Sequence, residues 1–422
     1  MKICDRQCCV ESMALSNVSN VTNALRFTPE GSFKISLFSD LHYGESTNTV
    51  GPPHDAHTAD TMAQILSAEN PQLAVLNGDL ITGRAKSGPS NSTLYIDSLV
   101  APLTDRHVRW ASVYGNHESD RGLCPDELLE RETTNYPHAS LTRRMVDDPD
   151  AGITNYYLPV WSSEEDNSSS AIAPELILWF FDSRGGQACE EAERPGSRRP
   201  NWVDDSVVHW FTQTRKSLQE KYNRTVPSIA FFHIPTYAMR AFQDASFAGP
   251  AAPGLNHDVV KQQGYIPGMQ EYRGQDYAFM EALLDTDGLI ATFSGHDHGN
   301  DWCFRWDSQL PYMNLTGNGL HMCYGRRTGY GGYGGWTRGG RQIELLLQEE
   351  GPPRLDTWVR VQDGTVGERA SIYSSSDPSA NMSQGSDYLR TSGAVKRERW
   401  FVLRWVMVWV AAAGWYVGGY DM

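Results

Sequence analysis

The residues of this chain that could do chemistry stand in five short polar blocks, each directly after an apolar stretch. The blocks are Ser39-Asp40-Leu41-His42, Asn77-Gly78-Asp79, Gly115-Asn116-His117-Glu118, His233-Ile234-Pro235 and Gly295-His296-Asp297-His298. Carboxylates, imidazoles and amide oxygens are ligands for borderline or hard divalent ions. Two such ions about 3.5–4 Å apart can clamp the attacking and leaving oxygens of a displacement at phosphorus. The blocks therefore predict a two-metal site for phosphate-ester chemistry.

The apolar stretches before the blocks must be the elements that position them. We expect strands over residues 33–38, 73–76, 108–114, 229–232 and 289–293. In open α/β sheets a site forms outside the carboxyl ends of the strands, so five loops that are distant in sequence can converge there. The continuous apolar run 176–181 fits a strand buried on both faces. Two later strands are expected over 342–347 and 357–361.

Helical patterns alternate with these strands. One helix is predicted near residues 58–69, because Met62, Ile65 and Leu66 share a face and Asn70-Pro71 forms a stop. A second is predicted after a cap at Asp204 or Asp205. This alternation predicts an α/β sheet with helices on its faces.

Composition limits the classes of partner. The 422 residues include 36 Lys and Arg against 51 Asp and Glu, a formal net charge of −15. Phosphate contacts need clustered Lys and Arg, so nucleic acid is disfavoured as a partner. An anionic substrate would need local cations, and bound metal ions could supply them. The seven cysteines include no Cys-x-x-Cys pair, which argues against a thiolate zinc site, whereas Cys303 and Cys323 could be bridged.

Composition along the chain predicts four segments. We expect a polar N-terminal arm at 1–30, one domain at 31–362, a disordered linker at 363–399, and an apolar C-terminal segment at 400–419 that could anchor the chain in a membrane. Residues 120–172 form a weakly patterned insertion. The Gly-rich stretch 325–340 lacks the spacing of a nucleotide-binding loop and is expected to be a flexible loop over the pocket.

The signals for cellular compartment conflict. Seven Asn-x-Ser/Thr sequons occur, at Asn17, Asn20, Asn91, Asn167, Asn223, Asn314 and Asn381, where chance alone gives roughly three. This excess favours a secretory or membrane-associated protein. The first residues show no apolar leader, so no signal peptide is expected and a cytoplasmic location stays open.

The five blocks resemble, in order, the signature blocks of the calcineurin-like metallophosphoesterases, over about residues 33–300. The later Gly-Tyr-Gly-Gly-Trp at 332–336, followed by Arg338 and Arg341, is similar to the branch of plant purple acid phosphatase 29 and the fungal Dcr-type phosphatases. The resemblance implies a four-layer α/β fold, in which a central sandwich of mixed sheets is flanked by helices and the dimetal site lies at the carboxyl ends of strands.

The resemblance also implies a role for each residue. A first ion would be held by Asp40, His42 and His298. A second would be held by Asn116, His233 and His296. Asp79 would bridge the two ions, and His117 would stand beside them and protonate the leaving alkoxide.

One departure from the purple acid phosphatases bears on the metals. Those enzymes place a Tyr three residues after the bridging Asp, where it binds ferric iron, and this chain has Thr82 there. We therefore expect no tyrosinate–iron colour, and two divalent or mixed-valence ions drawn from Mn, Zn and Fe. The oligomeric state is not predicted.

Three functions stay open from the sequence alone. The first is a phosphomonoesterase, with phosphoprotein among its substrates. The second is a phosphodiesterase or nuclease with the same metal core. The third is a catalytically inactive module, tethered to a membrane, that keeps its metals.

Overall fold

The computed structural model describes residues 24–45, 50–82, 92–120, 123–163, 173–188, 197–246, 254–268, 272–367 and 369–372. The chain divides into a unit of Met1–Ser392 and a unit of Gly393–Met422, and every described residue belongs to the first. The apolar segment 400–419 and most of the predicted arm and linker lie outside the described residues. Among the helices that are described, none is long and apolar enough to cross a lipid bilayer.

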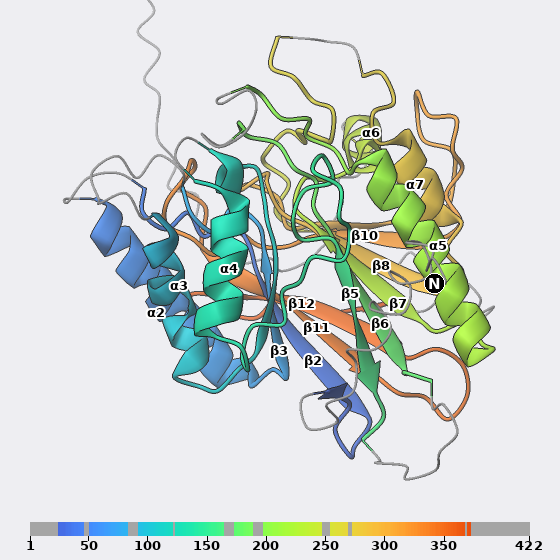
Figure 1. Ribbon diagram of the computed structural model, residues 1–422, viewed down its shortest axis with the longest axis horizontal. Helices are drawn as coiled ribbons and strands as arrows, with labels where there is room; N and C mark the ends of the chain where they lie inside the picture. Colours follow the sequence, from blue (N-terminus) through green and yellow to red (C-terminus); the bar gives the residue numbers. More distant parts are fainter. Residues whose placement is uncertain are drawn as a thin grey trace, which may run out of the picture. The chain divides into compact units, whose positions relative to one another are not determined.

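Two mixed β-sheets form the centre of the first unit (Figure 1). The seven-stranded sheet runs in the order β1 (Leu25–Arg26), β5 (Tyr156–Trp161), β6 (Leu176–Phe181), β7 (Ser228–Phe232), β8 (Leu289–Ser294), β10 (Leu320–Tyr324) and β9 (Cys303–Trp306). The six-stranded sheet runs in the order β13 (Ala370–Ile372), β12 (Arg354–Val361), β11 (Gly339–Leu346), β2 (Ser32–Phe38), β3 (Leu73–Asn77) and β4 (Trp110–Val113).

The sheets face each other across a shared apolar core. Alternate residues of each strand enter it, as with Phe33, Ile35 and Leu37 of β2. On the seven-stranded side, Ile229 and Phe231 of β7 enter the same core. This alternation follows from the two-residue period of a strand, and it leaves the second face of each sheet to be covered by helices.

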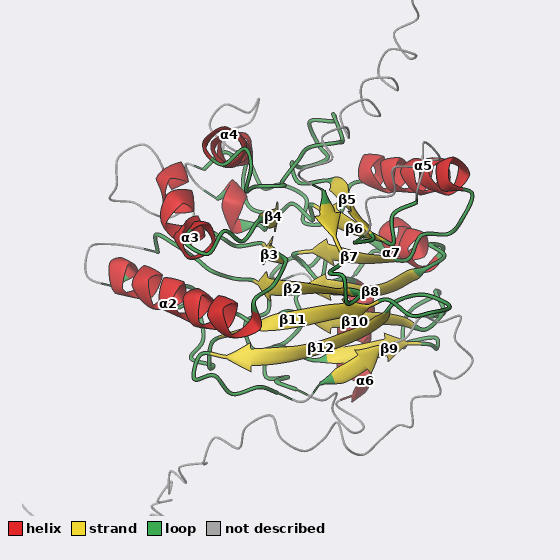
Figure 2. Cartoon of the chain, turned by 90° about the horizontal axis from the view of Figure 1, so that it is seen from below, coloured by secondary structure: helices red, strands yellow, loops and turns green. Residues whose placement is uncertain are grey.

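Helices cover both outer faces, which completes four layers (Figures 1 and 2). The six-stranded sheet carries α2 (Gly51–Glu69), α3 (Tyr95–Thr104) and α4 (Pro125–Asn135), with the short 3-10 turns η2 (Ser92–Leu94) and η3 (His117–Ser119) nearby in sequence. The seven-stranded sheet carries α5 (Asp205–Tyr222), α6 (Tyr237–Ser246) and α7 (Tyr277–Leu284). The four-layer α/β prediction is therefore confirmed.

The predictions for strand β6 and for the N-terminal cap of α5 are confirmed. The run at β6 is buried on both faces. Asp204 caps α5 by accepting a hydrogen bond from the backbone N–H of Ser206 at 3.0 Å. Helix α2 begins earlier than predicted, at Gly51, because Pro52 and Pro53 occupy its first turn, where a missing N–H costs nothing.

Other elements were missed. Strands β1 and β13 join the sheets outside residues 31–362, so the sheets extend beyond both predicted limits. The weakly patterned insertion contains α4 and β5. The bridge between Cys303 and Cys323 that the sequence allowed is present: a disulfide joins Cys303 of β9 to Cys323 of β10, and the two residues are paired directly across these strands.

Candidate metal centre

The five polar blocks follow β2, β3, β4, β7 and β8, and their loops meet at one edge of the sandwich. Within the six-stranded sheet the backbone N–H of Asp40 donates to the carbonyl of Gly78 at 3.0 Å. Across the seven-stranded sheet the N–H of Gly295 donates to the carbonyl of His233 at 2.9 Å. Because β2, β3 and β4 are parallel, as are β7 and β8, their carboxyl ends share an edge. The predicted convergence is observed.

The predicted ligands form three overlapping groups in which the ligand atoms lie within 4.8 Å of one another. The groups are Asp40 with His42 and His298; His42 with Asp79 and His117; and Asp79 with His233 and His296. Asn116 precedes His117 in η3, and the N–H of His117 donates to Asp79 Oδ1 at 2.9 Å. Seven of the eight predicted residues therefore lie together, and Asn116 is the chain neighbour of one of them.

Asp79 belongs to two of these three groups. Its Oδ2 is 3.0 Å from His233 Nε2 and 3.9 Å from His42 Nε2. Histidines from both predicted ligand sets thus face one carboxylate, as a bridging group requires. Gly78, with φ +86°, permits this arrangement, because a Cβ there would collide with the ring of His233.

Several polar atoms of the site lack a protein partner. Among the described residues, Asn116 Oδ1 and His296 Nδ1 are buried with no hydrogen bond. Nε2 of His42 and Nε2 of His298 lie 3.1 Å apart. Buried polar atoms normally find a partner, and imidazole nitrogens, carboxylates and an amide oxygen are metal ligands. The residues present therefore fit a pair of cations.

The backbone is strained where the ligands project. Asp40, His42, Asp79 and His296 have φ of 53°, 50°, 50° and 80°. Glycine would relieve this strain but would remove the side chain, so the strain is retained where the ligand is needed.

Comparison with known proteins identifies the family. A model of the calcineurin-like phosphoesterases matches residues 33–300. The chain belongs to this family. It is therefore a dimetal hydrolase of phosphate esters.

Curated relatives agree with the predicted branch of the calcineurin-like family. The chain is 27% identical over 368 residues to "Probable inactive purple acid phosphatase 29" of Arabidopsis thaliana, covering 80% of this chain and 85% of that protein. It is 28% identical over 350 residues to "Phosphatase DCR2" of Saccharomyces cerevisiae, covering 80% and 55%. A dimetal phosphatase from Danio rerio shares the fold, with a TM-score of 0.51 at 15% identity, over 81% of this chain and 99% of that one.

Burial keeps three histidines of this phosphoesterase neutral, the form in which an imidazole binds a metal. It lowers the pKa of His296 to about 3, with help from His233. Burial and the neighbouring His117 hold the pKa of His42 well below its ordinary value. Burial, with His42 beside it, does the same to the pKa of His298.

The carboxylates balance the remaining charge. Burial favours a protonated Asp79, but the cationic His233 and His117 outweigh it and hold the pKa of Asp79 well below its ordinary value. Burial opposes charge on His117 and His233 too, yet Asp79 raises their pKa values to about 9 and about 10. Burial, together with repulsion from Asp79, raises the pKa of Asp40 to about 6.

Two residues support the site although the sequence predicted no supporting role for them. Glu118 is fully buried, and its carboxylate accepts four backbone N–H bonds, from Asp79, Leu80, Ile81 and Gly115. It thereby ties the loop after β3 to the loop after β4. Thr82 Oγ1 lies 3.1 Å from His42 Nδ1, which leaves Nε2 of that ring facing the site. In the sequence, the only indication of this role was that Glu118 directly follows Asn116 and His117 in the third block.

The Asp between the two histidines of the last block is buried behind the site. Asp297 accepts a hydrogen bond from the hydroxyl of Tyr324 at 2.7 Å, and burial raises its pKa to about 7. Asp297 therefore packs behind the two histidines and is not exposed to solvent.

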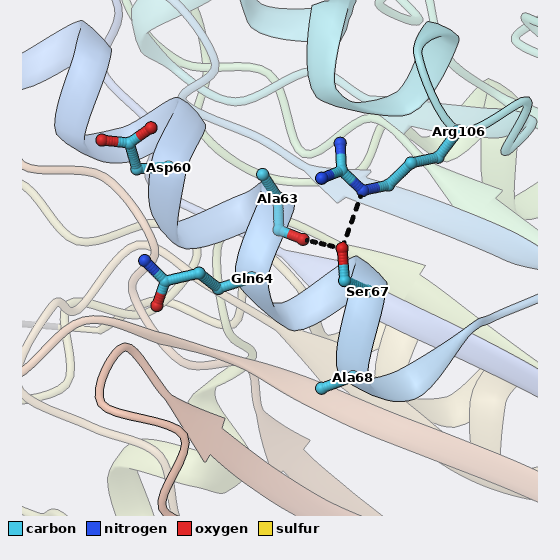
Figure 3. A pocket seen from close by; sticks show the side chains of 6 residues that line it. All are labelled: Asp60, Ala63, Gln64, Ser67, Ala68 and Arg106. Carbon is cyan, nitrogen blue, oxygen red and sulfur yellow. Dashed lines mark hydrogen bonds between the residues drawn. The ribbon is translucent and has the colours of Figure 1, made fainter.

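A separate shallow hollow lies on the outer face of α2 (Figure 3). It is lined by Asp60, Ala63, Gln64, Ser67, Ala68 and Arg106. Arg106 Nε donates to Ser67 Oγ at 3.0 Å, which closes one side of the hollow. None of the eight site residues lines it, so it has no part in the chemistry.

Proposed function

We propose that this phosphoesterase hydrolyses phosphate monoesters, with phosphoprotein among its substrates. The observation that carries the proposal is the position of Asp79 between two histidine-containing groups from opposite sheets. In this proposal Asp40, His42 and His298 hold one ion and Asn116, His233 and His296 hold the other. Bound ions would supply a nucleophile near neutral pH and stabilise charge at phosphorus.

The protein's own groups would direct the reaction around those ions. His117 has 30% of its side chain exposed, and its Nδ1 lies 3.5 Å from Asp120 Oδ2. This carboxylate orients the ring and favours its protonated form. His117 is therefore placed to donate a proton to the departing alkoxide, and Asp79 is placed to hold the two halves of the site in register.

The two other candidate functions make different demands. A nuclease needs a basic surface for the nucleic-acid backbone, and the net charge of −15 disfavours one. An inactive module would not require the complete ligand set, which this chain retains. The word "inactive" in the name of the Arabidopsis relative describes that protein.

Steady-state assays of the purified protein separate the three functions. Turnover of an aryl phosphate monoester and of a diester is measured with Mn, Zn or Fe added. Monoester turnover that is lost in Asp79→Asn and retained in Asp60→Asn supports the proposal, because Asp60 lies on the outer face of α2. Preference for the diester would favour the second function. Bound metal without any turnover would favour the third.

Elemental analysis of the isolated protein identifies the metals. Thr82 stands where a ligating Tyr would be and contacts His42 instead. We therefore expect two ions per chain and no tyrosinate charge-transfer band in the visible spectrum. Such a band would contradict this assignment.

We also propose a secretory history for the protein, with N-linked glycans at the exposed sequons. The Cys303–Cys323 disulfide supports an oxidising compartment. Asn223 and Asn314 both lie at exposed positions of loops or helix ends. Protein from a eukaryotic host should lose apparent mass on enzymatic deglycosylation, and the double variant Asn223→Gln/Asn314→Gln should lose less. An unchanged mass would refute the proposal.

A further inference from the structure

The Gly-rich loop, residues 325–338, connects β10 of one sheet to β11 of the other and passes the metal centre on the way. It is folded around a buried cation. Arg327 is 2% exposed, and its guanidinium donates to the carbonyls of Gly331, Tyr333 and Gly334 within the same loop. The loop is therefore tied internally, and the sequence-based expectation of a flexible cover did not anticipate this anchor.

The charge of Arg327 has no direct counterion in the part of the chain that the structure describes, since no carboxylate there forms an ion pair with it. Asp40 and Glu45 are the carboxylates whose charges act on it from farther away. A buried guanidinium is costly unless carbonyls or carboxylates satisfy it. The buried guanidinium of Arg327 is therefore expected to contribute to the neighbouring metal centre, because its burial costs free energy.

Tyr333 carries the connection from Arg327 to the metal ligand His298. Its carbonyl accepts hydrogen bonds from both Arg327 and His298 Nδ1, the latter at 2.8 Å. Its ring stacks on the ring of His298, with centroids 4.1 Å apart and planes 12° apart. Its hydroxyl accepts a hydrogen bond from the backbone N–H of His298 at 3.2 Å. Because a carbonyl can only accept, Nδ1 of His298 keeps its proton and Nε2 is left for the metal.

Gly332 brings the loop directly against two ligands of the first ion. At its φ of +72°, a Cβ would lie 2.6 Å from His298 Cε1 and 2.9 Å from His42 Cδ2. Its N–H donates to Glu45 Oε2 at 2.6 Å. Only glycine allows the loop to approach this closely.

His233, one of the two histidines proposed for the second ion, is oriented by a different part of the fold. Nδ1 of His233 donates to the carbonyl of Asn77 at 2.9 Å, and Asn77 is the last residue of β3. From this contrast we infer that Arg327 is a positioning residue for the first ion alone, acting through the carbonyl of Tyr333 on His298. This inference rests on the proposed assignment of ligands to the two ions.

Metal titration of single-site backgrounds tests the inference without relying on turnover. His233→Ala leaves the first ion's ligands, and His42→Ala leaves those of the second. Mn²⁺ binding is measured by calorimetry, with and without Arg327→Met. We expect Arg327→Met to weaken Mn²⁺ binding about 10- to 100-fold in the His233→Ala background, as supporting contacts to ligands do elsewhere. It should leave binding in the His42→Ala background unchanged.

Arg338→Met is the matched control. Arg338 also donates to loop carbonyls, those of Trp336 and Gly334, but does not contact the Tyr333 carbonyl or His298. It should leave Mn²⁺ binding unchanged in both backgrounds. An equal effect of Arg327→Met on both ions, or an effect on neither, overturns the inference.

A second variant covers the case in which Arg327→Met fails to fold. Gly332→Ala presses on His298 and His42 from the loop side and should also weaken binding only in the His233→Ala background. Equal weakening in both backgrounds would overturn the inference. The parent protein separates this result from the proposed function: if it binds none of Mn²⁺, Zn²⁺ and Fe²⁺, the two-ion assignment itself fails.

Discussion

His117 is the residue whose contribution depends most on the substrate, because a proton donor matters only when the leaving group needs one. We predict that His117→Gln lowers kcat about 10²- to 10⁴-fold for an alkyl phosphate, whose alkoxide must be protonated. The loss should be far smaller for 4-nitrophenyl phosphate, because that leaving group departs as an anion. Steady-state kinetics with the two substrates measure both values.

The metal content serves as the control for His117→Gln. His117 lies outside the proposed ligand sets, so the variant should retain two ions per chain by elemental analysis. Equal losses of kcat for both substrates would show that His117 acts on something other than the leaving group.

Asp276 is a buried residue away from the metal centre whose charge depends on pH. Burial raises its pKa to about 6, although the Tyr272 hydroxyl and the Tyr237 N–H donate to it. The unfolded chain has the lower, ordinary value, so the folded protein binds this proton more tightly. The contribution of Asp276 to stability is therefore fully present below about pH 4 and is lost as pH rises through about 6.

Asp276→Asn should remove this dependence. The free energy of unfolding of the variant, minus that of the parent, should rise by up to about 3 kcal/mol between pH 4 and pH 7. This follows from about 1.4 kcal/mol per pKa unit. Urea unfolding at several pH values measures the difference. A difference that stays constant with pH would contradict the assigned shift.

At the scale of elements, the sequence was informative where local pattern and burial agree. The strands before the five blocks were predicted to within two residues at either end, because each is a short segment rich in apolar residues. Helix α4 was missed because it buries Pro125, Leu128 and Glu132, which gives no apolar stripe. Strand β1 has two residues, and its pairing with β5 is set by a partner distant in sequence.

Glu132 shows what holds the unpatterned insertion in place. Its buried carboxylate accepts five side-chain hydrogen bonds, from Trp110, Ser112, Tyr114, Ser140 and Thr142. This arrangement parallels that of Glu118, which accepts four backbone N–H bonds beside the metal centre. A buried carboxylate at the hub of many donors cannot be predicted from sequence, because its partners come from separate loops.

These two carboxylates make a matched pair for separating stability from metal binding. Glu118→Gln and Glu132→Gln each turn an amide NH₂ toward existing donors, so each should lower the free energy of unfolding by about 1–3 kcal/mol. Only Glu118→Gln should also weaken Mn²⁺ binding, because Glu118 fixes the loop that carries Asp79. Equal loss of Mn²⁺ affinity in both variants would mean that general destabilisation explains the effect.

At the scale of the whole molecule, the order of the blocks along the chain predicted the site better than any single block did. The ligand residues come from both sheets, and the sandwich is what brings β3 and β7 to one edge. The contacts around His298 could not be predicted, because they depend on how the Gly-rich loop crosses between the sheets. The sequence identified the ligands, whereas the supporting groups required the tertiary structure.

The ions should therefore stabilise the sandwich as well as serve the reaction. Both sheets contribute ligands, and without cations the buried Asp40 and Asp79 repel each other. A ligand present at 100 times its Kd stabilises the folded state by about 2.7 kcal/mol. We predict that removing the ions with a chelator lowers the unfolding temperature by several degrees and that adding Mn²⁺ restores it. The unfolding temperature of Asp79→Asn should change much less with either treatment. A parent protein that unfolds at the same temperature with and without chelator would contradict a metal site shared by the two sheets.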